Sequence, residues 1–184
     1  MTAESDAAST IMVVMGVSGC GKTTIGKALA ARLGWVYKEG DDFHTAHNVE
    51  KIRAGIPLDD ADRSPWLTAI AAWMDAQAAA GHCGVIGCSA LKRGYRDFLR
   101  AGRPQVWFVY LRAAREELEC RVATRHHPYM PASLLDSQLA ALEEPAGDEP
   151  DCVTADANGD VGSTVDAILR MLLAQGIVDA SPSH

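Results

Sequence analysis

The stretch that decides the fold is MGVSGCGKTT, residues 15–24. Its spacing, Gly16 followed by four residues and then Gly21, Lys22 and Thr23, matches the pattern G-x-x-x-x-G-K-[ST]. In that pattern, backbone N–H groups surround a phosphate chain and the lysine neutralises its charge. Without a ligand, the same residues would form an ordinary glycine-rich turn. An apolar run before the loop and a helical pattern after it favour phosphate binding, because a helix N-terminus carries partial positive charge.

Apolar runs and helical patterns alternate along the rest of the chain. Residues 11–15 predict a buried strand, and residues 24–33 predict a helix that ends at Gly34. Further strands are predicted at residues 35–38, 83–90, 105–111 and 152–156. Further helices are predicted at residues 64–81, where Ser64 and Pro65 begin the helix, and near residues 114–124, 133–142 and 161–173. Near-continuous apolar strands are typical of a parallel sheet with helices on both faces, so we expect a three-layer α/β fold.

Length and composition limit the class of protein. A chain of 184 residues with 48% hydrophobic residues fits one globular domain, which we expect over residues 11–175, with loose tails at 1–10 and 176–184. The net charge of -7 argues against nucleic-acid or anionic-membrane partners. No apolar run approaches the roughly 20 residues that cross a bilayer. Five cysteines without metal-type spacing indicate reduced, mostly buried thiols in a cytoplasmic protein.

The glycine loop predicts the contacts of a nucleotide. We expect the N–H groups of residues 18–23 on the β-phosphate, Lys22 between the β- and γ-phosphates, the Thr23 hydroxyl on Mg²⁺ and Thr24 near the α-phosphate. ATP and Mg²⁺ are therefore the expected cofactors. Cys20 is either a redox-sensitive thiol or a small side chain tolerated at this position. The candidate nucleotide-binding residues of the loop are Gly16, Ser18, Gly19, Cys20, Gly21, Lys22, Thr23 and Thr24.

The carboxylates that a metal ion and an acceptor need must come from outside the glycine loop. The chain has no N-K-x-D motif, which a GTPase needs to read its base, and its third apolar run ends in VIGCSALK without the acid that a motor ATPase places there. The segment KEGDDFH, residues 38–44, offers Glu39 and Asp41 instead. In an extended chain both side chains would point in one direction. One could hold the water shell of the metal ion while the other orients an acceptor hydroxyl and takes its proton; the alternative is a solvated acidic turn.

Five segments together resemble a known family: MGVSGCGKTT, EGDDFHTAHNVEKIRAGIPLDDADRSPWL, CSALKRGYRDFLR, FVYLR and LLDSQLAALEEP. From about residue 12 to 172 the chain resembles the P-loop gluconate kinases (gluconokinases), relatives of shikimate and adenylate kinases. The resemblance implies ATP-dependent phosphorylation of D-gluconate at its 6-hydroxyl, feeding the pentose phosphate or Entner–Doudoroff route. It implies a P-loop NTPase fold with a five-stranded parallel sheet, a helical substrate-binding region at about residues 42–65 and a mobile lid at about 124–133. Family members are often homodimers.

The resemblance also implies roles for individual residues. Asp41 would orient and deprotonate the acceptor hydroxyl. This leaves Glu39, the other acid of the KEGDDFH motif, as the residue expected to hold Mg²⁺ through water. From spacing alone, Arg63 could instead pair with the neighbouring aspartates Asp60 or Asp62. The positive residues Lys51 and Arg53 could form a solvated helix face. The substrate-binding residues that the resemblance implies are Asp41, His44, Arg63, Ser89 and Lys92.

Arg121 and Arg125 lie on the predicted helix that enters the segment RHHPYMP, residues 125–131, which is the lid by resemblance. Arg121 and Arg125 are expected to bind the nucleotide, and an arginine delivered by a closing segment stabilises charge on the γ-phosphate while excluding water. The alternative is ion pairing with glutamates of the same helix. The adjacent histidines His126 and His127 lack the spacing of a structural zinc site, so no zinc is expected. The predicted catalytic residues are Lys22, Asp41 and Arg125.

Two other functions remain compatible with the sequence. One is a kinase of another small hydroxylated acid, such as shikimate or a different aldonate. The other is a nucleotide-binding regulatory protein that kept the loop and lost the chemistry. Because Lys22, Thr23 and Asp41 are all present, the enzyme is favoured.

Overall fold

A computed structural model of the chain describes residues 9–124 and 133–179. Its centre is a parallel sheet of five strands in the order β2-β3-β1-β4-β5. Every residue of the central strand β1 is buried. The sheet confirms the parallel α/β architecture expected from the sequence. The strands are β1 (Ile11–Met15), β2 (Val36–Glu39), β3 (Gly84–Gly87), β4 (Val106–Arg112) and β5 (Cys152–Asp156).

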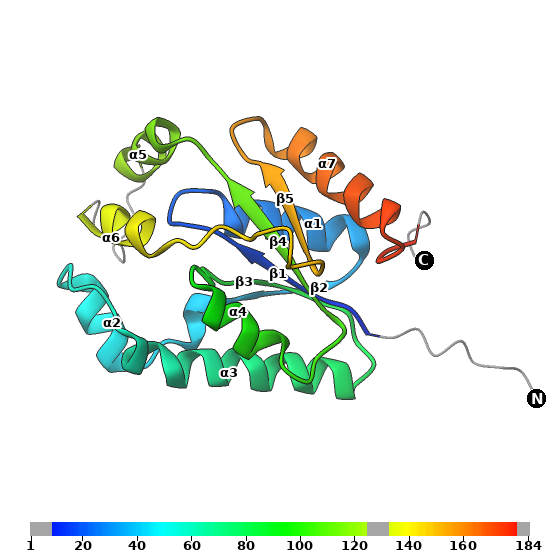
Figure 1. Cartoon of the computed structure of the whole chain (residues 1–184), viewed down its shortest axis with the longest axis horizontal. Coiled ribbons are helices and arrows are strands. Elements are labelled where there is room, and N and C mark those ends of the chain that lie inside the picture. The colour runs from blue at the N-terminus through cyan, green and yellow to red at the C-terminus, as the bar shows by residue number, and fades with distance from the viewer. Residues whose placement is uncertain (1–8, 125–132, 180–184) are drawn as a thin grey trace, which may run out of the picture.

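Helices cover both faces of the sheet (Figure 1). Alternate side chains of β1 point to opposite faces, as strand geometry requires. Met12 and Val14 pack in one core with α1 and α7, whereas Ile11, Val13 and Met15 pack in a second core with α3 and α4. The helices are α1 (Lys22–Leu33), α2 (Ala46–Arg53), α3 (Asp60–Ala79), α4 (Arg93–Arg100), α5 (Arg115–Thr124), α6 (Ser133–Ala141) and α7 (Val161–Ala174), with a 3-10 turn, η1 (Gly40–Phe43). None of the helices in the described part of the chain could span a membrane.

The start of α3 differs from the sequence prediction, which placed it at Ser64 and Pro65. The helix begins at Asp60, because Asp59 and Asp62 form a reciprocal capping box: the Asp59 carboxylate accepts from the Asp62 N–H, and the Asp62 carboxylate accepts from the Asp59 N–H. Pro65 therefore lies inside the helix. Two aspartates three residues apart can thus make both hydrogen bonds of a capping box, in which the first residue is usually serine or threonine.

The carboxyl ends of β1, β2 and β3 meet at one edge of the sheet. The glycine loop follows β1, η1 follows β2, and the turn at residues 88–92 follows β3. In Figure 1 the strands end on the side of the molecule where α2, α5 and α6 lie. The parallel sheet therefore brings three loops together, and these loops form the candidate site. Most of the predicted lid, and most of the predicted tails, lie outside the described residues.

Candidate active site

The glycine loop has positive φ angles, which favour glycine, at Gly16, Gly19 and Gly21. Gly21 caps α1 with a φ of 102°, and Gly16 has a φ of 143°, where a Cβ atom would lie 2.9 Å from the Leu111 carbonyl oxygen. Lys22 folds back over the loop, and its Nζ donates to the Val17 carbonyl oxygen at 3.1 Å. The loop therefore gathers backbone N–H groups and one ammonium group at the N-terminus of α1. Such an arrangement binds anions.

A carboxylate from β2 reaches the start of α1. The Thr23 hydroxyl donates to Glu39 Oε2 at 2.7 Å, and the Tyr37 hydroxyl donates to the same oxygen at 2.9 Å. Burial and the nearby Glu39 charge raise the pKa of Tyr37, so its phenol stays a donor. Hydroxyl and carboxylate oxygens fit Mg²⁺, which usually takes one or two protein ligands together with phosphate oxygens and water. Within residues 9–124 and 133–179, no group of three or more acidic, histidine or cysteine side chains could hold a metal ion.

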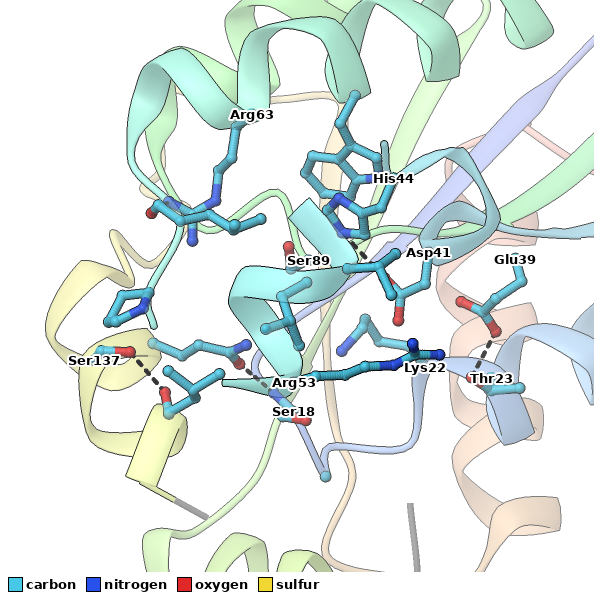
Figure 2. A pocket seen from close by; sticks show the side chains of 18 of the residues that line it. Ser18, Lys22, Thr23, Glu39, Asp41, His44, Arg53, Arg63, Ser89 and Ser137 are labelled. Carbon is cyan, nitrogen blue, oxygen red and sulfur yellow. Dashed lines mark hydrogen bonds and ion pairs between the residues drawn. The ribbon is translucent and has the colours of Figure 1, made fainter. Parts of the chain in front are cut away.

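The sequence analysis considered that an extended chain would point Glu39 and Asp41 in the same direction. The structure does not have this arrangement. Extended geometry ends at Glu39, and η1 turns the chain immediately afterwards. The turn is fixed by Trp66, whose Nε1 donates to the Gly40 carbonyl oxygen at 2.8 Å, and by tight packing of Gly40, where a Cβ atom would lie 2.2 Å from the Gly87 carbonyl oxygen. Both carboxylates nevertheless line the same cavity (Figure 2).

His44 lies against Trp66 at the base of this cavity. The two rings stack with centroids 4.6 Å apart and an interplanar angle of 10°, and the His44 side chain is 9% exposed. Its Nε2 is 3.8 Å from Asp41 Oδ1, and its buried Nδ1 has no hydrogen-bond partner among the described residues. Burial lowers the pKa of His44 more than the Asp41 charge raises it, so the imidazole is neutral at pH 7. A neutral imidazole can donate to one hydroxyl and accept from another.

The cavity has a volume of about 660 Å³ and joins the glycine loop to η1, α2, α3 and α6. It gathers ten of the predicted site residues: Ser18, Gly19, Gly21, Lys22, Thr23, Glu39, Asp41, His44, Arg63 and Ser89. Helix α6 adds Ser137 and Gln138, which the sequence analysis did not assign. The Gln138 Oε1 accepts from the Ser18 N–H at 2.6 Å, so α6 contacts the loop directly. The polar run from Asp136 to Gln138, between apolar residues of the same helix, was the available signal. Arg53 also lines the cavity, and Figure 2 shows its side chain extending from α2.

Arg63 and Lys92 differ in position. Arg63 lines the cavity, and its Nη1 donates to the Leu58 carbonyl oxygen at 2.6 Å. The ion pairs of Arg63 with Asp60 or Asp62, considered from spacing, do not form; these carboxylates pair with Lys92 and Lys51 instead. Lys92 is not part of the cavity lining.

A second cavity of about 230 Å³ lies on the other side of the loop. It is lined by Cys20, Thr24 and Arg121, together with residues that follow β5. Arg121 pairs with Glu117 at 2.7 Å, as one alternative expected, and its Nη2 also donates to the Ala157 carbonyl oxygen at 2.8 Å. Cys20 is 1% exposed. Arg125, His126 and His127 lie outside the described residues.

The expectation that the cysteines are mostly buried is met only in part. All five are free; Cys20 and Cys88 are buried, Cys83 and Cys152 are partly buried, and Cys120 is exposed.

A loop of this kind on a five-stranded parallel sheet, facing a carboxylate-lined cavity, defines a P-loop kinase-like protein. The family model described as shikimate kinase matches residues 18–172. A gluconokinase of Gluconobacter oxydans (strain 621H) is 52% identical over 139 residues, covering 76% of this chain and 78% of that protein. The chain belongs to the shikimate kinase family and, within it, to the gluconokinases.

Solved structures agree with this membership. An unliganded sugar kinase from Janibacter sp. HTCC2649 matches with a TM-score of 0.85 and 44% identity, covering 96% of this chain and 99% of that one. A gluconokinase from Sinorhizobium meliloti 1021 matches with a TM-score of 0.80 and 41% identity, covering 91% of this chain and 93% of that one. The resemblance stated from the sequence is therefore confirmed.

Proposed function

We propose that this chain transfers the γ-phosphoryl group of ATP to the 6-hydroxyl of D-gluconate, giving 6-phosphogluconate and ADP. The observation that carries the proposal is that the phosphate loop, with Lys22 and Thr23, lines one cavity with Asp41 and Arg63. Such a cavity can hold a terminal phosphate and an acidic acceptor side by side. The gluconokinase relatives support gluconate as that acceptor.

In the proposed reaction, the chain's own residues bind, orient and exchange a proton. Lys22 and the loop N–H groups neutralise the phosphates, and the terminal phosphoryl group passes to the oxygen of the acceptor alcohol. Asp41, whose side chain is 69% exposed, can accept the proton of that alcohol as the new P–O bond forms. Neutral His44 would hydrogen-bond a neighbouring hydroxyl of the acceptor.

Thr23 and Glu39 would hold Mg²⁺, Glu39 through water. When bound, the ion supplies positive charge that offsets the β- and γ-phosphate oxygens. Tyr37 and Thr23 both donate to one Glu39 oxygen and fix its position, so the carboxylate needs little reorganisation to serve this role.

The second cavity would take the nucleoside end of ATP. Thr24 lines this cavity and not the larger one, whereas Ser18 lines only the larger one. A triphosphate wrapped by the loop would thus run from Thr24 toward Ser18, with Arg121 beside its nucleoside end. A catalytic Arg125, a cytoplasmic location, homodimerisation and the absence of nucleic-acid or membrane partners stay predictions.

The decisive experiment measures ADP release with D-gluconate, other aldonates, glucose and shikimate as acceptors. We expect gluconate to give the highest rate, far above water. Asp41→Asn should lower that rate about 100-fold or more, because the proton acceptor is lost. The matched control is Asp42→Asn, one residue further along the same turn, whose carboxylate accepts from Lys38 at 2.7 Å; it should keep most of the rate. The proposal fails if no acceptor exceeds water, or if Asp41→Asn keeps the full rate.

A further inference from the structure

Arg63 is held from one side of its guanidinium group. Its Nη1 donates to the Leu58 carbonyl oxygen at 2.6 Å and to the Tyr95 hydroxyl at 3.4 Å. Its Cζ lies 5.7 Å from the centre of the Tyr95 ring. Within the described residues, Nε and Nη2 make no hydrogen bond. The edge formed by these two nitrogens can bind a carboxylate with two parallel hydrogen bonds.

The contacts of Arg63 rest on a second set of residues. The Tyr95 hydroxyl donates to Asp60 Oδ1, and Lys92 Nζ donates to the same oxygen at 2.7 Å. Lys92 also lies 5.5 Å from the centre of the Tyr95 ring, so the ring has two cations near it. Hydrogen bonds from Lys92 and Tyr95 lower the pKa of Asp60, which therefore stays ionised at neutral pH.

The network joins two distant parts of the chain. Asp60 lies in the first turn of α3, one turn before Arg63, whereas Lys92 and Tyr95 lie at the start of α4. Of these four residues, only Arg63 lines the cavity. Because Lys92 balances the negative charge of Asp60, the positive charge of Arg63 remains available to a ligand. The geometry thus separates one residue that can touch an acceptor from three that hold it.

We infer that Tyr95, Asp60 and Lys92 are positioning residues that present Arg63 to the carboxylate of the acceptor. They set the preference for a sugar acid over an uncharged sugar without contacting either. The sequence analysis expected Lys92 to bind the substrate directly; its contacts assign it this indirect role. The inference rests on the proposed function, because it requires an acidic acceptor in the larger cavity.

Two variants test the network. Tyr95→Phe removes the hydroxyl and keeps the ring, and Lys92→Met removes a charge from a partly exposed side chain with little change in length. Each should raise the KM for gluconate about tenfold, the effect of one charge-assisted hydrogen bond, and leave the KM for ATP within about twofold. Arg63→Ala should raise the gluconate KM further. In the Arg63→Ala background, Tyr95→Phe should have no additional effect.

The control is Tyr110→Phe, which removes the hydroxyl of a buried tyrosine on β4 that does not line the cavity. It should leave both KM values unchanged. Two results would overturn the inference while the proposed function stands. One is that the effects of Tyr95→Phe and Arg63→Ala add in the double variant. The other is that neither Tyr95→Phe nor Lys92→Met changes the KM for gluconate. A wild type that releases no gluconate-dependent ADP would overturn the proposed function, and the inference with it.

Discussion

Replacing Glu149 by glutamine should destabilise the fold strongly, although this residue touches neither cavity. Glu149 is 3% exposed and lies just before β5. Its carboxylate accepts from Arg96 Nε at 2.8 Å, from Arg96 Nη2 at 2.6 Å and from Arg100 Nη2 at 2.6 Å. Arg96 is fully buried, and its Nη1 also donates to the Ala90 and Leu91 carbonyl oxygens, both at 3.2 Å. Glu149 is thus the ion-pair partner of the buried Arg96, shares Arg100 with Asp97 and Asp151, and helps to fix the turn after β3.

The size of the effect follows from burial. Glutamine keeps one acceptor oxygen but no charge, and its amide N–H₂ group would face an arginine donor. Breaking a buried ion pair from one side costs about 3 to 5 kcal/mol, because the remaining charge is left without compensation. That is a large part of the roughly 5 to 15 kcal/mol that stabilises an ordinary domain. Because the cluster holds the carbonyl groups beside Ser89, the variant should also lose activity at temperatures below its unfolding midpoint.

The pH dependence of this difference has a definite sign. Burial acts to raise the pKa of Glu149, but hydrogen bonds from Arg96 and Arg100 outweigh it and lower the pKa from 4.5 to about 2. A lowered folded-state pKa contributes stability that is complete above the unfolded-state value and is lost as the pH falls toward the folded-state value. The free-energy difference between wild type and Glu149→Gln should therefore be constant above about pH 5 and shrink between pH 4 and 2.

Urea unfolding followed by circular dichroism measures the free energy of unfolding of both proteins. The control is Asp148→Asn, a neighbouring carboxylate whose side chain is 68% exposed and pairs with Arg93 at 2.9 Å. A surface pair of this kind contributes less than about 1 kcal/mol. The reasoning is refuted if Glu149→Gln loses no more stability than Asp148→Asn, or if the difference stays constant down to pH 2.

Three further predictions concern the packing of α1, the metal ion and the acceptor. Gly26→Ala should lower stability by about 1 to 3 kcal/mol in thermal melts, because its Cβ would lie 2.6 Å from the Tyr37 ring; Gly94→Ala, with open space around it, should be neutral or slightly stabilising. Glu39→Gln should raise the Mg²⁺ concentration for half-maximal rate severalfold in a metal titration, and an unchanged requirement would remove Glu39 from the metal site. Because burial lowers the pKa of His44 below 6.5, the KM for gluconate should be constant from pH 6.5 to 8, and a transition there would contradict a neutral imidazole.

The sequence predicted those features that depend on neighbouring residues. The loop from Gly16 to Thr23 and the buried strands could be read from local spacing and apolar runs, since each requires only its own segment. The turn η1 could not, because it depends on Trp66, which lies 26 residues from Gly40. The ion pair between Lys92 and Asp60 was equally hidden, since the two residues lie 32 positions apart and only the fold brings them together.

The missing acid at the end of β3 and the acid at the end of β2 have one physical explanation. β3 lies between β2 and β1 in the sheet, so a carboxylate on β2 must cross β3 to reach Thr23 at the start of α1. Glu39 is paired in register with Gly87, the last residue of β3. A Cβ atom on Gly87 would lie 3.2 Å from Glu39 Oε1 and 2.8 Å from the Tyr37 hydroxyl. A side chain there would displace both groups, whereas glycine leaves room for Glu39 to cross. The strand next to the phosphate loop therefore contributes space, and the carboxylate comes from the strand beyond it.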